Sequence, residues 1–247
     1  MPLGLPDRVE GFLFDMDGVL TQTATLHAAA WKQSFDEFLE RRDGPGFTPF
    51  DEVADYDRYV DGRSREDGTR AFLASRHVEV PDGGPGDDRG QPTIRGISNR
   101  KNELFNQKMD ADGVTVFDDS LLYVRAVARA GYRRAVVSAS ANTAQVLEAA
   151  GIADLFDARV DGVMAAERHL AGKPAPDMFL AAAEIIGVPP DRAAVFEDSL
   201  AGVEAGRAGH FAVVVGVDRV GQAEALQRHG ADLVVSDLTR LLSDDRR

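Results

Sequence analysis

The sequence contains no cysteine and is short of positive charge. The absence of cysteine excludes disulfide bonds and thiolate chemistry. Lysine and arginine total 28 against 41 aspartates and glutamates, a formal net charge of -13, which disfavours nucleic acid and anionic membranes because both are bound by clustered basic residues. No apolar run is long enough for a membrane span or a secretory core. We therefore expect a cytoplasmic protein that binds neither nucleic acid nor membrane.

A chain of 247 residues can form one large or two modest domains, and its apolar content of 44% is enough for a substantial buried core. From Gly131 onward, short apolar runs alternate with alanine-rich helical stretches. The runs are nearly continuous in apolar residues, as in a parallel sheet with helices on both faces. We therefore expect an α/β fold with a doubly wound parallel sheet. With a run near the start of the chain included, the expected strands lie at 9–14, 134–138, 193–197, 211–215 and 233–235, and two expected helices at 142–150 and 199–208.

A different pattern follows the first expected strand. Apolar residues recur at helical spacing in 26–41, 64–77 and, less regularly, 94–109, and no buried strand is evident there. A stretch rich in glycine and proline, 81–90, is expected to form a flexible loop between two of these helices. The pattern predicts a helical cap inserted over the carboxyl edge of the sheet. The expected boundaries are 1–21 and 114–247 for the α/β core and 22–113 for the cap.

Two aspartates follow directly after the first expected strand. Asp15 and Asp17 would share a face because side chains alternate along an extended chain, and Gly18 lets the backbone turn away after them. Asp-x-Asp-Gly also occurs in solvated turns and calcium loops, but the following residues supply none of the further acidic ligands of a calcium loop. One carboxylate can attack phosphorus while its neighbour transfers protons. The pair therefore indicates phosphoryl transfer.

Two further segments carry groups suited to phosphate. Ser138 ends the second expected strand and precedes a helix N-terminus, where backbone amides bind phosphate, although Ser140 or Asn142 could serve only as the helix cap. Lys173 lies in Gly-Lys-Pro-Ala-Pro, where the adjacent proline restricts its backbone. Its ammonium group could neutralise a phosphoryl group and a nearby carboxylate.

A second acidic pair, Glu197 and Asp198, ends another expected strand. Such a pair can be an ordinary helix N-cap. If it met Asp15 and Asp17 at one edge of the sheet, however, the four carboxylates would repel one another in a partly desolvated cleft. A divalent cation among them would remove that repulsion, and oxygen ligands together with phosphate favour magnesium.

At this point the residues resemble the haloacid dehalogenase superfamily of phosphotransferases, because all four of its motifs occur in order along the chain. Matches in the cap make the sequence similar to the β-phosphoglucomutase-like subfamily in particular. The residues that carry this resemblance are 14–23, His27, Trp31, 64–67, 101–102, 138–140, Asn142, 172–177 and 197–199.

The resemblance implies roles for individual residues. Asp15 is the expected nucleophile, which becomes an aspartyl phosphate, and Asp17 the general acid and base. Ser138 and Lys173 would hold the transferring phosphoryl group, and Arg65 would grip the other end of a small sugar phosphate. The expected magnesium site comprises Asp15, the Asp17 carbonyl, Asp198 and nearby Glu197. The expected substrate-binding residues are His27, Trp31, Ser64, Arg65, Lys101, Ala139, Ser140 and Asn142.

One departure from the family pattern bears on the reaction. A lysine usually precedes the asparagine of the second motif, whereas Ala141 precedes Asn142 here. Three functions therefore stay open: a mutase that interconverts β-glucose 1-phosphate and glucose 6-phosphate through a 1,6-bisphosphate, a magnesium-dependent phosphatase for a small sugar phosphate, and a phospho-accepting regulatory module. The sugar and its anomer stay open as well. We expect a monomer or a weak dimer.

Overall fold

The computed structural model describes residues 3–84 and 86–242, which fall into two compact units. One unit lies within Met1–Gln22 and Val114–Arg247, and the other is Thr23–Gly113. The chain leaves the first unit after Gln22, one residue later than the sequence suggested. The reason is a contact with the returning segment, because the Gln22 amide donates a hydrogen bond to the Thr115 carbonyl at 2.8 Å.

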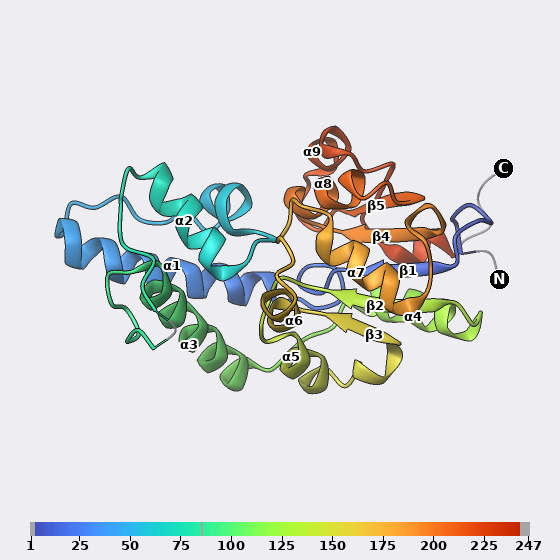
Figure 1. Ribbon diagram of the computed structural model, residues 1–247, viewed down its shortest axis with the longest axis horizontal. Helices are drawn as coiled ribbons and strands as arrows, with labels where there is room; N and C mark the ends of the chain where they lie inside the picture. Colours follow the sequence, from blue (N-terminus) through green and yellow to red (C-terminus); the bar gives the residue numbers. More distant parts are fainter. Residues whose placement is uncertain (1–2, 85, 243–247) are drawn as a thin grey trace. The chain divides into compact units, whose positions relative to one another are not determined.

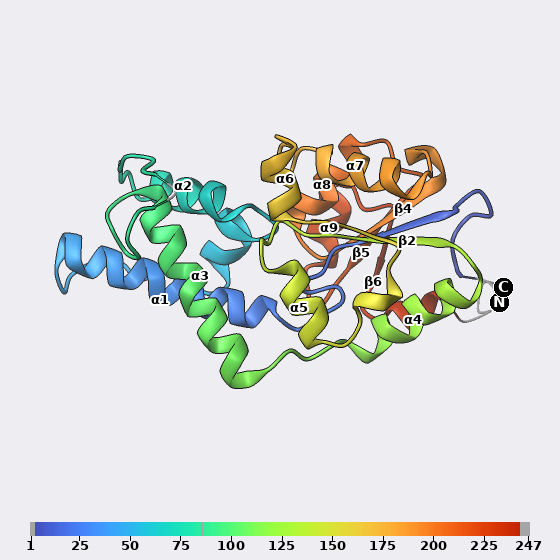
Figure 2. The ribbon, with the colours of Figure 1, turned by 60° about the horizontal axis from the view of Figure 1, so that its bottom comes forward.

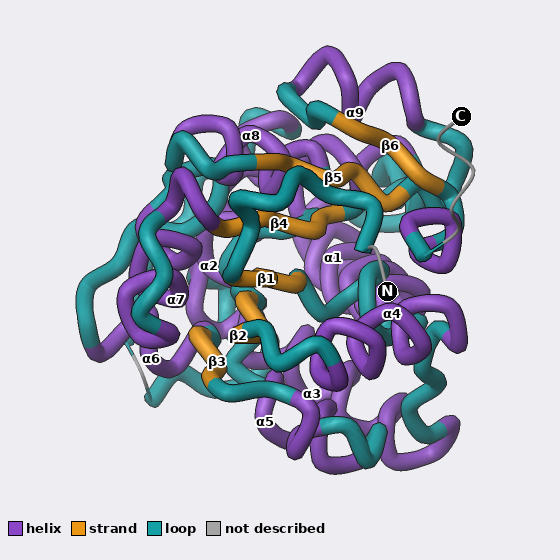
Figure 3. Tube along the Cα trace, turned by 90° about the vertical axis from the view of Figure 1, so that its right-hand side faces the viewer, coloured by secondary structure: helices purple, strands orange, loops and turns teal. Residues whose placement is uncertain are grey.

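The first unit is built on a six-stranded sheet in which every pairing is parallel. The strand order is β3-β2-β1-β4-β5-β6, so the chain winds outward from β1 in both directions (Figure 3). This topology confirms the doubly wound parallel sheet expected from the apolar runs. The strands are β1 (Gly11–Phe14), β2 (Arg133–Val137), β3 (Ala158–Val160), β4 (Ala193–Glu197), β5 (Val213–Val217) and β6 (Leu233–Val235).

Several details of the sheet differ from the expected strands: β1 begins at Gly11 rather than Val9, and β2 spans Arg133–Val137 rather than 134–138. The edge strand β3 was not expected, because its three residues include the exposed Arg159 and form no apolar run. The fifth strand begins at Val213 rather than Phe211 and continues through Gly216 to Val217. The helices of this unit are α4 (Asp118–Arg129), α5 (Thr143–Ala149), α6 (Gly162–Glu167), α7 (Asp177–Ile186), α8 (Leu200–Ala208) and α9 (Ala223–His229), labelled in Figure 1.

Helices on both faces of the sheet explain why its strands are continuous in apolar residues. On one face, Leu13 of β1 and Val195 of β4 belong to the buried cluster that includes α7. On the other face, Phe14 and Phe196 stack at 4.5 Å between ring centroids and contact Tyr123 of α4. Figure 2 shows α7 and α4 on opposite sides of the strands. The central strands are thereby packed on both faces, and this packing positions the residues at their carboxyl ends.

The second unit is helical in its described residues, 23–84 and 86–113, as the sequence predicted. Its core is aromatic: Phe35 stacks on Trp31 at 4.9 Å and packs against Phe72 at 4.1 Å between ring centroids. The described part of the expected loop 81–90 contains no helix or strand, and Pro85 lies outside the described residues. The elements are α1 (Ala24–Asp43), a π-helical turn (Tyr56–Val60), α2 (Arg65–Ser75) and α3 (Ile94–Asp112).

The two segments that connect the units run side by side within the first unit. Thr21 and Val116 form an antiparallel bridge, and the Phe117 amide donates to the Leu20 carbonyl at 3.0 Å. The first of these segments begins four residues after Asp17, so one short turn separates the paired aspartates from the exit of the chain. In the described part of the chain, no helix combines the length and apolarity that a membrane span requires.

Candidate active site

Three predicted site residues directly follow adjacent strands of the sheet. Asp15 follows β1, Ser138 follows β2 and Asp198 follows β4. Because all three strands are parallel and neighbours, their carboxyl ends meet at one edge, the usual place for a ligand in an open α/β sheet. All three side chains are buried. The structure therefore brings Asp15, Ser138 and Asp198 together at one edge of the sheet.

Lys173 lies at the centre of this group, in the loop between α6 and α7. Its ammonium group forms ion pairs with Asp15 Oδ1 and Glu197 Oε1, and all three side chains are buried. The same nitrogen donates to the Val137 carbonyl at 3.4 Å and lies 5.1 Å from the centroid of the Phe179 ring. The peptide bond from Lys173 to the next residue, a proline, is cis. A single cation is thus shared by two buried carboxylates.

The charges in this group interact strongly because burial excludes water. Burial raises the pKa of Asp15 well above its ordinary value; Lys173 opposes this shift, and Glu197 and Asp17 add to it. Burial alone would lower the pKa of Lys173, but the carboxylates of Asp15 and Glu197 outweigh it and raise that pKa. The lysine therefore stays protonated. Further positive charge beside Asp15 would help to keep this carboxylate ionised.

Both oxygens of Glu197 are already engaged. One accepts from Lys173, and the other accepts from the Ser199 amide and hydroxyl, each at 2.9 Å. A Cβ on Gly202 would lie 1.8 Å from Glu197 Oε1, so this glycine makes room for the carboxylate beneath α8. The N-cap of α8 is Ser199, which accepts from the Gly202 amide at 3.0 Å. Neither Glu197 nor Asp198 is therefore the N-cap of this helix.

The carboxylates of Asp15, Glu197 and Asp198 could hold a metal ion. Each offers an oxygen within 4.8 Å of the others, and all three residues are buried. An all-oxygen donor set of carboxylates suits a hard divalent cation such as magnesium. The residues present therefore fit the cation that the sequence predicted.

Gly18 fits tightly against this group. Its φ of +89° is in the left-handed region, and a Cβ at this position would lie 1.7 Å from Asp198 Oδ2. We expect Gly18→Ala to lower kcat by about 10²-fold because the added methyl group displaces the Asp198 carboxylate. The matched control is Gly131→Ala, whose φ is +79° but whose Cβ would meet nothing within 4 Å. Steady-state kinetics with a magnesium titration would compare the two variants.

Backbone strain should be similar in both variants, because each places a side chain on a left-handed residue at a cost of about 1–2 kcal/mol. Thermal unfolding measures this shared cost. Gly18→Ala should in addition need more magnesium for half-maximal activity, while Gly131→Ala should retain wild-type kinetics. Wild-type kinetics in both variants would contradict the close packing of Gly18 against Asp198.

The segment after β2 forms a chain of hydrogen bonds that begins at Asp17. Ser138 Oγ donates to Asp17 Oδ2 at 3.3 Å and accepts from the Ser140 amide at 3.2 Å. Ser140 Oγ in turn accepts from the Asn142 amide at 3.2 Å. Asn142 precedes α5 and makes no side-chain cap bond to it. Ser138 is thus brought to the paired aspartates, and half-buried Ala139 and Ser140 lie on the same segment.

The predicted cap residues form two groups within the second unit. His27 Nδ1 and Lys101 Nζ lie 2.6 Å apart, and Lys101 Nζ lies 5.0 Å from the centroid of the Trp31 ring. All three residues are buried. Ser64 is the N-cap of α2 and accepts from the Asp67 amide, while half-buried Arg65 begins that helix. Ser64 therefore has a structural role whatever else it does.

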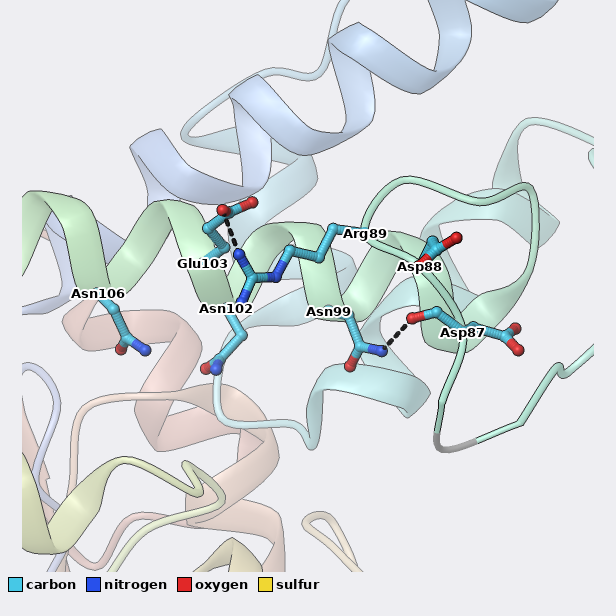
Figure 4. Close-up of a pocket in the computed structure, with 7 residues that line it drawn as sticks. All are labelled: Asp87, Asp88, Arg89, Asn99, Asn102, Glu103 and Asn106. Atoms are coloured by element: carbon cyan, nitrogen blue, oxygen red, sulfur yellow. Dashed lines mark hydrogen bonds and ion pairs between the residues drawn. The ribbon is translucent and has the colours of Figure 1, made fainter.

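The second unit also has a polar cavity of about 420 Å³ between α3 and the loop before it (Figure 4). Arg89 pairs with Glu103 at 2.5 Å, and Asn99 Nδ2 donates to the Asp87 carbonyl at 3.1 Å. These bonds join the loop to the helix. The residues that line the cavity are Asp87, Asp88, Arg89, Asn99, Asn102, Glu103 and Asn106.

Two residues near the site were missed by sequence reasoning, Arg219 and Gln222 in the loop after β5. Gln222 Nε2 donates to the Asp198 carbonyl at 2.9 Å. Arg219 reaches the carbonyls of Gly18 and Val19. The contacts that these two side chains make with the site are to backbone oxygens, which any residue provides, so no pattern in the sequence marks them.

Comparisons with known proteins agree with this geometry. A family model described as haloacid dehalogenase-like hydrolase matches residues 9–210. The β-phosphoglucomutase of Mycobacterium bovis is 56% identical over 246 residues, covering 97% of this chain and 94% of that protein. The β-phosphoglucomutase of Bacillus subtilis is 32% identical, covering 94% and 92%. A crystal structure of β-phosphoglucomutase from Clostridium difficile superimposes with a TM-score of 0.76 at 25% identity, covering 94% of this chain and 93% of that one.

Proposed function

The chain belongs to the haloacid dehalogenase-like hydrolase family, and we propose that it acts as a β-phosphoglucomutase. Such an enzyme interconverts β-glucose 1-phosphate and glucose 6-phosphate through a 1,6-bisphosphate and an aspartyl phosphate. The observation that carries the proposal is the 56% identity to a β-phosphoglucomutase along 97% of this chain. The buried group of Asp15, Ser138 and Lys173 provides the chemistry that this reaction needs.

Asp15 is the proposed nucleophile. In the first half-reaction, one of its oxygens forms a bond to a phosphorus of the bisphosphate, and the bond from that phosphorus to the sugar oxygen breaks. Lys173, paired with Asp15, offsets negative charge that grows on the phosphoryl oxygens, which lowers the barrier rather than merely binding substrate. Glu197 holds this lysine in place through the other ion pair.

Asp17 is the proposed general acid and base. It gives its proton to the departing sugar oxygen in the first half-reaction and takes one from the attacking sugar hydroxyl in the second. The Ser138 hydroxyl, 3.3 Å from Asp17 Oδ2, helps to orient this carboxylate. Asp17 is half-buried, in contrast to Asp15, so it is the more accessible of the two aspartates.

We propose that magnesium is held by Asp15, Asp198 and the Asp17 carbonyl. When bound, the ion supplies positive charge that offsets the charge of the transferring phosphoryl group and of the clustered carboxylates. Glu197 lies within the same group of oxygens, but both of its oxygens are engaged by Lys173 and Ser199. We therefore assign Glu197 mainly to the positioning of Lys173.

The substrate is proposed to be a small sugar phosphate, gripped at its non-reacting phosphate by Arg65. His27, Trp31 and Lys101 are proposed to take part in substrate binding from the cap. The inserted unit of 23–113 has no place in a phospho-accepting regulatory module, so we do not retain that alternative.

A sugar phosphatase is the second candidate, and Ala141 is the observation that favours it. Where the family usually has a lysine before Asn142, this chain has a methyl group. One cation fewer near the non-reacting phosphate would weaken retention of the bisphosphate. The sugar monophosphate that is formed together with the aspartyl phosphate is held through the same phosphate, so its early release would leave the aspartyl phosphate of Asp15 exposed to attack by water.

The two candidates are separated by one assay. The purified protein is incubated with magnesium and β-glucose 1-phosphate, with and without a catalytic amount of the 1,6-bisphosphate, and both glucose 6-phosphate and inorganic phosphate are followed. We expect glucose 6-phosphate to form, faster with the bisphosphate, and EDTA to stop it. The α-anomer serves as the matched control and should react more slowly. Phosphate release without glucose 6-phosphate would replace the mutase by the phosphatase.

A further inference from the structure

The side chain of Arg219 has an unusual set of partners in the first unit. Its Nε donates to the Gly18 carbonyl at 3.3 Å and its Nη2 to the Val19 carbonyl at 3.4 Å. The guanidinium carbon lies 3.9 Å from the centroid of the Phe117 ring. Only 14% of the side chain is exposed. Arg219 thus contacts both the turn after Asp17 and the segment that returns from the cap.

The start of α4 adds further contacts, and Nη1 of Arg219 also donates to the Ser236 carbonyl at 3.1 Å. Arg219 Nη1 pairs with Asp119 at 3.1 Å, and Nη2 also donates to Ser120 Oγ at 2.9 Å. Ser120 Oγ itself donates to the Val19 carbonyl at 2.6 Å. An ion pair with Asp119 would by itself satisfy the charge of the arginine. The two bonds to consecutive carbonyls are additional, and they fix the orientation of the peptide after Gly18.

This orientation matters because of what lies on either side of the turn. Gly18 is the next residue after Asp17, and it packs against the Asp198 carboxylate. A rotation of the peptide after Gly18 would therefore move both the side chain and the backbone carbonyl of Asp17. Misplacement of a reacting group by about 1 Å can lower a rate by about 10²-fold.

We propose that Arg219 is a positioning residue for phosphoryl transfer, which holds the turn of Gly18 and Val19, and with it Asp17, in register with the returning segment at Phe117. The inference rests on the proposed role of Asp17 as acid and base. Arg219 touches neither substrate nor phosphoryl group in this scheme. Its planar guanidinium binds two neighbouring carbonyls while stacking on an aromatic ring, which a lysine cannot reproduce.

The test compares Arg219→Met and Arg219→Lys with the wild type in the mutase assay. We expect Arg219→Met to lower kcat by between about tenfold and 100-fold with KM for β-glucose 1-phosphate nearly unchanged. Arg219→Lys should recover part of kcat because it keeps a donor and the charge beside Asp119. The matched control is Arg207→Met, which removes an exposed arginine paired with Asp232 and should leave kcat unchanged.

Thermal unfolding of each variant separates positioning from stability. Asp119→Asn removes the ion pair but leaves the carbonyl contacts, so it should lose stability yet keep more of kcat than Arg219→Met does. An unchanged kcat in Arg219→Met, or a raised KM with kcat intact, would overturn the proposal. If Arg219→Met does not fold, Arg219→Lys takes its place in the test: an unchanged kcat, or a raised KM with kcat intact, would again overturn the proposal.

Failure of the proposed mutase function can be distinguished from failure of the proposal for Arg219. A wild-type enzyme that forms no glucose 6-phosphate contradicts the mutase and leaves Arg219 to be tested on phosphatase turnover of p-nitrophenyl phosphate. In that assay the same fall in kcat is expected, because Asp17 serves either reaction. A wild-type kcat for Arg219→Met in both assays would exclude a positioning role.

Discussion

Asp15→Asn is expected to lower turnover by at least about 10⁴-fold while the protein stays folded. An amide cannot form the bond to phosphorus that a carboxylate oxygen forms. The fold should tolerate the change, because Lys173 retains Glu197 as a partner. The measurement is the steady-state rate of glucose 6-phosphate formation, together with mass spectrometry of the protein after incubation with the bisphosphate.

The covalent intermediate gives this prediction its sharpest test. Wild-type protein should gain the mass of one phosphoryl group under single-turnover conditions, and Asp15→Asn should gain none. Asp191→Asn is the matched control, because Asp191 is an exposed aspartate of the same unit that lies outside the site. Its rate and its labelling should equal those of the wild type. Labelling that persists in Asp15→Asn would assign the nucleophile to another residue.

Lys173→Met is expected to have the second largest effect, on stability as well as on rate. The substitution leaves the buried carboxylates of Asp15 and Glu197 without their shared cation. Removal of one partner from a buried ion pair costs about 3–5 kcal/mol. The rate should fall by about 10²- to 10³-fold through loss of the charge that faces the phosphoryl group. Chemical denaturation in EDTA measures the free energy of unfolding, and steady-state kinetics measure the rate.

The loss of stability in Lys173→Met should depend on pH in a defined direction. Burial already raises the folded-state pKa of Asp15 above its ordinary value, and removal of Lys173 takes away the group that opposes this shift. A carboxyl group whose pKa is higher in the folded than in the unfolded state stabilises the fold only while protonated. The destabilisation should therefore be small at about pH 4, the ordinary range of an aspartate, and grow as the pH rises.

A double variant tests whether the carboxylates of Asp15 and Glu197 cause the loss of stability in Lys173→Met. Lys173→Met with Glu197→Gln removes one of the two stranded charges. It should be more stable than the sum of the single effects implies, by about 1–3 kcal/mol. Additive effects, or a destabilisation that does not change with pH, would show that lost packing against Phe179 rather than charge explains the single variant.

Much of the fold could be predicted because it depends on local patterns. β4 and β5 are buried on both faces, so they appear in the sequence as continuous apolar runs. β3 could not be predicted, because an edge strand with the exposed Arg159 lacks that pattern. The helices of the cap could be predicted from the helical spacing of their apolar residues alone. The boundary at Gln22 depended instead on a hydrogen bond to a residue far along the chain.

The candidate site could be predicted as far as strand geometry determines it. Since parallel strands share one carboxyl edge, Asp15, Ser138 and Asp198 could be placed together from their positions at the strand ends. The sequence could not show that Glu197 directs one oxygen to Lys173 and the other to Ser199, because the paths of two loops decide it. The bonds from Arg219 to the Gly18 and Val19 carbonyls were equally invisible, since backbone oxygens carry no residue identity.

The paired connecting segments have a consequence for how such a protein can diversify. The bridge between Thr21 and Val116 holds the exit and the re-entry of the chain at neighbouring positions. The sheet can therefore form in the same way whatever segment is inserted between them. A longer, shorter or unrelated excursion could occupy that point without disturbing strand order. The insertion and the strands that carry Asp15, Ser138 and Asp198 are thereby encoded by separable stretches of gene, and exchange of the former need not disturb the latter.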